Sequence, residues 1–174
     1  MTTAAWCGCE SSALFATIVY TIGAIGNTIG GVFSDRILHK SNNVRRARVG
    51  AAVFGFVGAL ISLLPILQAS DKVFVAICLS AGFFFAEMVI GPMWAIPMDI
   101  APKYSGTASG FMNTGSALAA VLSPLAFGFI IDATGNWNLP FIGSIGLLLA
   151  GALLASTMHP ERPFEEEVAR TSTV

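Results

Sequence analysis

The stretch Ala13–Phe33, ALFATIVYTIGAIGNTIGGVF, decides the fold, because it contains no Asp, Glu, Lys or Arg and ends directly before Ser34-Asp35-Arg36. An α-helix rises about 1.5 Å per residue, so a block of this length crosses a hydrocarbon core of about 30 Å. Backbone N–H and C=O groups in lipid must be satisfied within the segment, which a helix achieves. The stretch therefore predicts a membrane-spanning helix.

Four further apolar blocks follow the first one along the chain. They cover about residues 49–68, 73–98, 105–131 and 139–158. The whole chain is 55% hydrophobic and 11% charged, whereas soluble domains carry about 25% charged residues. We therefore expect an all-α, polytopic membrane protein with five spans between residues 13 and 158. Residues 1–12 belong to none of these spans, and residues 159–174 form a polar tail.

Several classes of function find no support in the composition. The net charge of −1 argues against a nucleic-acid partner. The cysteines Cys7, Cys9 and Cys78 are too few for a disulfide framework and lack the spacing of a zinc site. His39 and His159 lie in polar segments away from any nucleophile, and the chain has no Walker-type phosphate loop. We expect no enzyme activity, no metal and no cofactor.

The basic residues indicate the orientation in the membrane. One side of the bilayer receives only Lys72, and the other receives eight basic residues: Arg36, Lys40, Arg45, Arg46, Arg48, Lys103, Arg162 and Arg170. Basic residues accumulate on the cytoplasmic side of membrane proteins. We therefore expect the amino terminus, with residues 1–12, outside and the tail in the cytoplasm.

Small residues recur at helical spacing in two of the expected spans. In the first span they are Gly23, Gly26, Asn27, Gly30 and Gly31, and in the fourth they are Gly106, Gly110 and Gly115. Helix association in lipid depends on close packing, so we expect these faces to contact neighbouring helices. Prolines within or near the spans, which free backbone carbonyls, predict kinks at Pro65, Pro92, Pro97 and Pro124.

The sharpest local motif is Gly31-Val-Phe-Ser-Asp35-Arg36-Ile-Leu-His-Lys40, where the first span leaves the membrane. Glycine allows a neighbouring helix to approach, and Asp35 can accept hydrogen bonds at the positive amino end of another helix. Arg36 can pair with a carboxylate at the end of a third helix. The simpler alternative is a basic loop that only stops translocation.

This motif resembles the cytoplasmic gating loop of the major facilitator superfamily, which follows the second helix and, in a weaker copy, the eighth. The segments Gly91–Pro102 and Ser105–Ser116 resemble helices ten and eleven of its anion:cation symporter family, and Gly128–Trp137 extends the match. The resemblance covers roughly residues 13–158. It implies that the five spans are helices eight to twelve of a twelve-helix transporter of the bacterial inner membrane.

The same resemblance implies a partner for Asp99 at the end of the third span. The corresponding helix end carries an acidic residue in the superfamily, and we expect Asp99 to pair with Arg36. Proteins of this family carry organic anions such as sugar acids, hexuronates and phthalate, usually together with protons. The substrate lies between two six-helix halves, so the chain lacks the first seven helices of such a protein.

Seven polar or aromatic side chains are candidates for the substrate cavity: Tyr20, Asn27, Glu87, Trp94, Ser109, Asn113 and Ser116. Glu87 is the only acid deep inside a span, and such a residue is either functional, for example in proton binding, or a polar packing anchor. In the fourth span, Ser109, Asn113, Ser116 and Ser123 form one polar stripe. This stripe predicts either hydrogen bonds between helices or one wall of the cavity, with Asn113 contacting the substrate.

Two functional hypotheses follow. The first is the carboxyl-terminal part of a proton-coupled organic-anion symporter, which needs the missing amino-terminal helices or a partner chain before it transports. The second is a non-transporting membrane scaffold or subunit that pairs with another chain. A drug-type antiporter is a weaker alternative, since the segments around Trp94–Asp99 and Ser105–Ser116 match the anion:cation symporters instead.

Overall fold

A computed structural model describes residues 3–68 and 71–161, and all regular structure within these ranges is helical. The helices are α1 (Thr3–Ser41), α2 (Val44–Leu63), α3 (Lys72–Ile100), α4 (Ser105–Thr134) and α5 (Asn138–Thr157), with short 3-10 segments η1 (Leu64–Gln68) and η2 (Pro102–Tyr104). Within these two ranges, five helices are long and apolar enough to cross a membrane. The predicted all-α fold with five spans is therefore confirmed.

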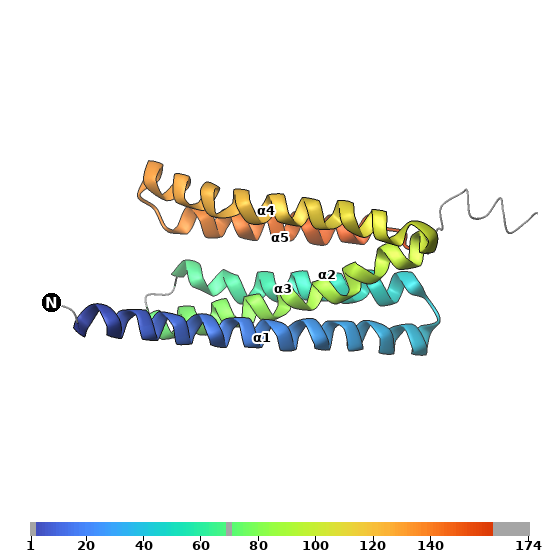
Figure 1. Cartoon of the computed structure of the whole chain (residues 1–174), viewed down its shortest axis with the longest axis horizontal. Coiled ribbons are helices and arrows are strands. Elements are labelled where there is room, and N and C mark those ends of the chain that lie inside the picture. Colours follow the sequence, from blue (N-terminus) through green and yellow to red (C-terminus); the bar gives the residue numbers. More distant parts are fainter. Residues whose placement is uncertain (1–2, 69–70, 162–174) are drawn as a thin grey trace, which may run out of the picture.

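The helices run side by side along the long axis of the molecule (Figure 1). In this view α4 and α5 lie on one side, α1 on the other, and α2 and α3 between them. The α1–α2 and α3–α4 connections lie at the same end of the bundle, which we call the basic end because it carries Arg36, Lys40, Arg45, Arg46, Arg48 and Lys103. Arg162 and Arg170 lie outside the described residues.

The first two spans are longer at the basic end than the apolar blocks suggest. The expected spans end at Phe33 and resume at about residue 49, but α1 continues to Ser41 and α2 begins at Val44. Only Asn42 and Asn43 connect them. Asn42 adopts a left-handed backbone with φ of 49°, which asparagine tolerates better than most residues. Lys and Arg have a high helix propensity, so a helix can continue after it has left the membrane. Hydropathy therefore predicts where the membrane span ends but not where the helix ends.

Residues 3–12, which precede the first expected span, also belong to α1. A kink was predicted at Pro65; the α-helical part of the second span ends at Leu63, and Pro65 lies in η1, which continues the span to Gln68. The other three prolines, Pro92, Pro97 and Pro124, lie inside α3 and α4.

Glycines of α1 allow its backbone to approach α3 closely. A Cβ atom at Gly26 would contact the carbonyl oxygen of Phe84, and one at Gly30 would contact the carbonyl oxygen of Met88. Pro92, four residues after Met88, lacks the N–H group that would bind this carbonyl within α3. The Cα–H group of Gly30 therefore lies where it can donate a weak hydrogen bond to the carbonyl oxygen of Met88. The predicted packing role of the α1 glycines is confirmed for this pair of helices.

Helix α2 lies at the centre of the packing and contacts α1, α3 and α5. Ala52, Val89 and Ala155 form a buried cluster between α2, α3 and α5. Small side chains let these helices approach each other in the way that helix packing in lipid requires. This arrangement packs the middle of α2 against the middle of α3 and the end of α5.

Helix α4 differs from the others, because none of its residues is buried. A Cβ atom added at Gly106, Gly110 or Gly115 would meet nothing within 4 Å in the described chain. The expectation that these glycines contact a neighbouring helix is therefore wrong for this chain. The surface of α4 remains open to lipid, water or another polypeptide.

Candidate functional site

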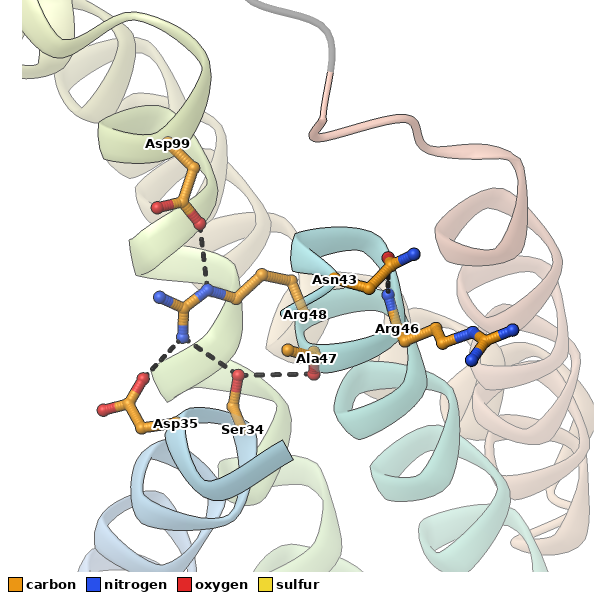
Figure 2. Close-up of polar contacts among 7 residues, drawn as sticks. All are labelled: Ser34, Asp35, Asn43, Arg46, Ala47, Arg48 and Asp99. Atoms are coloured by element: carbon orange, nitrogen blue, oxygen red, sulfur yellow. Dashed lines mark hydrogen bonds and ion pairs between the residues drawn. The ribbon is translucent and has the colours of Figure 1, made fainter. Parts of the chain in front are cut away.

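Arg48 of α2 lies at the centre of a polar cluster at the basic end (Figure 2). Its Nε donates to Asp99 Oδ2 at 2.9 Å, and its Nη1 donates to Asp35 Oδ1 at 2.8 Å and to Ser34 Oγ at 2.9 Å. Arg48 is 8% exposed, whereas the side chains of Asp99 and Asp35 are 25% and 62% exposed. One guanidinium group thus joins α1, α2 and α3, and water screens its pair with Asp99 less than its pair with Asp35.

Ser34 completes this cluster and is fully buried. Its hydroxyl accepts the hydrogen bond from Arg48 and donates to the carbonyl oxygen of Ala47 at 3.3 Å. Both hydrogen-bonding functions of the hydroxyl are therefore used, which a buried polar group requires. The hydrogen bond from Ser34 to Ala47 also links α1 directly to the first turn of α2.

The inward position of Arg48 follows from the pattern of small residues on α2. The buried face of this helix consists of Ala47, Arg48, Ala51, Ala52, Gly55 and Ala59. Arg48 lies three and four residues before Ala51 and Ala52, so it shares their face. At the start of the helix, the side chain of Asn43 accepts from the backbone N–H of Arg46 and fixes where α2 begins.

The predicted pair between Asp99 and Arg36 is wrong, because Asp99 binds Arg48 instead. Neighbouring residues of a helix point about 100° apart, so Arg36 turns away when Asp35 faces Arg48. Arg36 and Lys40 are both exposed, and neither forms an ion pair among the residues that the structure describes. Asp35 was expected to accept from backbone N–H groups at the amino end of another helix, and it accepts instead from the side chain of Arg48, which the motif does not include.

The motif glycine, Gly31, lies where α1 and α3 approach each other. A Cβ atom at Gly91 of α3 would lie 2.9 Å from the backbone nitrogen of Gly31 and 3.2 Å from the carbonyl oxygen of Asn27. A Cβ atom at Gly31 itself would meet nothing within 4 Å. The close approach at this point therefore depends on Gly91 more than on Gly31.

Arg45 makes a second connection from the start of α2 that the sequence did not suggest. Its Nε donates to the carbonyl oxygen of Met158 at 3.2 Å, and its Nη2 donates to that of Ser156 at 3.3 Å. The last carbonyls of a helix have no partner within the helix and carry the negative end of its dipole. Arg45 thus caps α5, while Arg48 binds α1 and α3.

Among the cavity candidates on α1 and α3, Tyr20, Asn27 and Glu87 lie near the interface of these two helices. The ring of Tyr20 meets that of Phe83 edge to face, with 5.8 Å between centroids. Glu87 is half-buried, and a Cβ atom at Gly23 would lie 3.0 Å from its Cγ, so this glycine leaves room for the acid. Asn27 is half-buried, and Trp94 is 38% exposed.

The candidates on α4 lie apart from this group. Asn113 and Ser116 are exposed and Ser109 is half-buried, and Ser116 donates to the carbonyl oxygen of Met112 in its own helix. Among the described residues, no side-chain hydrogen bond joins α4 to α1 or α3. The two groups of candidates are therefore not assembled into one site within this chain.

A groove of about 630 Å³ is lined by residues of α2, α3, α4 and α5. Its walls are mostly apolar and include Phe56, Phe83 and Leu147. Ser123 of α4 and Ser144 of α5 supply the only hydroxyl groups among its lining residues. Ser123, the last residue of the predicted polar stripe, thus faces this groove.

The five apolar spans of the described residues, three of them joined by a charged cluster at the basic end, define the chain as a polytopic membrane protein. The family model described as Major Facilitator Superfamily matches residues 7–124. The chain belongs to this superfamily, whose members are transporters and not enzymes.

Several curated relatives are transporters of anions. The probable sulfoacetate transporter SauU of Cupriavidus necator is 43% identical over 148 residues, which are 85% of this chain and 34% of that protein. The probable galactarate/D-glucarate transporter GudP of Pseudomonas putida is 32% identical over 123 residues, 70% of this chain and 26% of that protein. The chain thus spans about a third or less of the length of these relatives.

A short relative also exists. The protein YjhE of Escherichia coli K12 is 59% identical over 76 residues, which are 44% of this chain and 93% of that protein. No solved structure matches the chain.

Proposed function

We propose that this chain forms the carboxyl-terminal part of a secondary transporter that carries an organic anion, a sugar acid or related carboxylate, together with protons. The observation that supports this most strongly is the likeness, over 85% and 70% of the chain, to transporters named for sulfoacetate and for galactarate and D-glucarate. Both names refer to anions that carry a carboxylate. The chain lies in the bacterial inner membrane with its amino terminus outside and its tail in the cytoplasm, in agreement with the excess of basic residues at one end.

The polar stripe of α4 supplies one wall of the substrate cavity in this proposal. Asn113 and Ser116 are exposed on a helix that crosses the membrane. Polar side chains in lipid are unfavourable, so they line a water-filled cavity or contact another helix. The amide of Asn113 offers a donor and an acceptor to a hydroxylated carboxylate. Glu87, close to α1, binds the coupled proton.

The Arg48 cluster holds the cytoplasmic ends of α1, α2 and α3 together. Its ion pairs span three helices, so α1, α2 and α3 move together at this end when the transporter changes conformation. Arg45 adds α5 to the unit. Helix α4, with no buried residue, is the element that meets the amino-terminal helices of such a transporter or a partner chain.

The alternative is a non-transporting scaffold or subunit that pairs with another chain. The open surface of α4 fits this function as well, because it needs a covering polypeptide in either case. The two functions differ in whether Asn113 contacts an anion.

Substrate protection of a cysteine tests the proposal. The 148 matched residues of the Cupriavidus relative are exchanged for those of this chain, with Asn113→Cys as the only accessible cysteine. Saturating sulfoacetate or glucarate should slow maleimide labelling at this position. Leu122→Cys is the matched control, because Leu122 is exposed on the opposite face of α4. Equal labelling with and without every anion would favour the scaffold.

A further inference from the structure

A polar hollow of about 440 Å³ lies at the basic end, between the start of α2 and the end of α5. Its lining residues are Asn43, Arg45, Arg46, Val49, Gly50 and Ser156. The Arg48 cluster is on another side of α2, since Arg48 faces inward toward α1 and α3. The hollow is therefore separate from the candidate functional site.

Two arginines make this hollow positively charged. Arg45 binds the carbonyl oxygens of Ser156 and Met158, which are neutral, so its charge has no carboxylate partner there. The side chain of Arg46 points away from the Arg48 cluster (Figure 2). Among the described residues, no carboxylate lies within 4.0 Å of a side-chain nitrogen of Arg45 or Arg46. The amino end of α2 adds the positive end of its dipole.

Exposed apolar stripes lead from the hollow along both helices toward the middle of the membrane. On α2, Val57 and Ile61 continue the face of Gly50 and are 43% and 61% exposed. On α5, Leu153 and Leu149 continue the face of Ser156 and are 62% and 52% exposed. A charged hollow at the basic end thus adjoins two exposed apolar stripes.

We propose that this hollow binds the headgroup of an anionic phospholipid, whose acyl chains lie along the two stripes. Guanidinium groups bind phosphate through charge-assisted hydrogen bonds. Basic pockets between membrane helices on the cytoplasmic side are suited to acidic headgroups. A free phosphate would use the arginines but gain nothing from the stripes, so the apolar surface favours the lipid. Bound lipid would hold α2 and α5 together at this end, and this role does not depend on which substrate is transported.

Native mass spectrometry of the full chain tests the proposal. The purified chain is incubated in detergent with phosphatidylglycerol, or with phosphatidylcholine as the zwitterionic control, and retained lipid is counted. We expect phosphatidylglycerol to be retained preferentially. Arg46→Gln should weaken its retention about fivefold, the change expected for one basic side chain near an anionic lipid, ~1 kcal/mol. Arg36→Gln is the matched control, because it removes an exposed arginine of the same end outside the hollow.

A second variant fills the hollow without removing charge. A Cβ atom at Gly50 would meet nothing within 4 Å, so Gly50→Leu places its side chain in the hollow. Leucine has a higher helix propensity than glycine, so the variant should stay folded and lose retention of phosphatidylglycerol. Equal losses for Arg36→Gln and Arg46→Gln, or no loss for Gly50→Leu, would overturn the proposal. Competition by inorganic phosphate as effective as by the lipid would overturn it in favour of a free anion.

Discussion

Replacement of Arg48 by methionine removes the cation of the cluster and keeps a long, unbranched side chain that fits the same space. The change leaves Asp35 and Asp99 without their ion-pair partner, and Ser34 without its donor. The hydroxyl of Ser34 keeps its bond to the carbonyl oxygen of Ala47. The loss of stability therefore comes mainly from the two carboxylates.

The two carboxylates should contribute unequally. The side chain of Asp99 is 25% exposed and that of Asp35 is 62% exposed. A hydrogen bond to a charged group contributes about 1.5–3 kcal/mol, whereas an exposed ion pair contributes about 0.2–1 kcal/mol. Loss of one partner from a buried pair costs about 3–5 kcal/mol, and the exposure of Asp35 moves the expected loss for Arg48→Met to the lower end, about 3 kcal/mol. Asp99→Asn should cost more than Asp35→Asn.

The assay is the reversible unfolding of the purified chain in mixed micelles by dodecyl sulfate, followed by the loss of helical circular dichroism. Arg36→Met is the matched control, because Arg36 is an exposed arginine next to Asp35. Its effect should stay within about 0.5 kcal/mol, as for most surface substitutions. An equal loss for the two variants, or a larger one for Arg36→Met, would refute the assignment of Arg48 as the central cation.

Three further predictions concern packing, orientation and coupling. Gly30→Ala should lower the free energy of unfolding by about 1–3 kcal/mol, because its methyl group meets the carbonyl oxygen of Met88. In the same titration, Gly31→Ala should leave the free energy of unfolding unchanged or raise it by up to about 1 kcal/mol, because its methyl group meets nothing. In a background without native cysteines, an impermeant maleimide added to intact cells should label Asn136→Cys and not Lys40→Cys, and the reverse pattern would contradict the orientation. In the chimera with the Cupriavidus relative, Glu87→Gln should abolish accumulation driven by a pH gradient but retain exchange of labelled for unlabelled anion, whereas unchanged accumulation would exclude Glu87 as the proton site.

The number and approximate position of the spans could be predicted because a long apolar stretch directly indicates a segment that lies in the hydrocarbon core of the membrane. Helix ends could not, because the polar residues between Ser34 and Ser41 remain helical after the membrane ends. The glycines of α1 were predicted to pack and do so against α3, whereas those of α4 meet nothing in this chain. Periodicity identifies a smooth face but does not say which helix covers it.

The charged cluster shows what a local motif leaves undecided. Asp35 stood out because of its motif, and Asp99 because of its place at a helix end. Arg48 is one of eight basic residues assigned to the same side of the bilayer, and no local motif includes it. Its spacing from Ala51 and Ala52 indicates the buried face of α2, and this pattern is the signal that could have found it.

The central claim is that this chain supplies the carboxyl-terminal helices of an organic-anion transporter, and uptake by vesicles tests it most directly. Inside-alkaline vesicles contain the Cupriavidus relative, the chimera carrying the 148 matched residues of this chain, or this chain alone. We expect labelled sulfoacetate or glucarate to accumulate with the chimera and not with the chain alone. A folded, membrane-inserted chimera that takes up neither anion, beside a relative that transports, would contradict the claim.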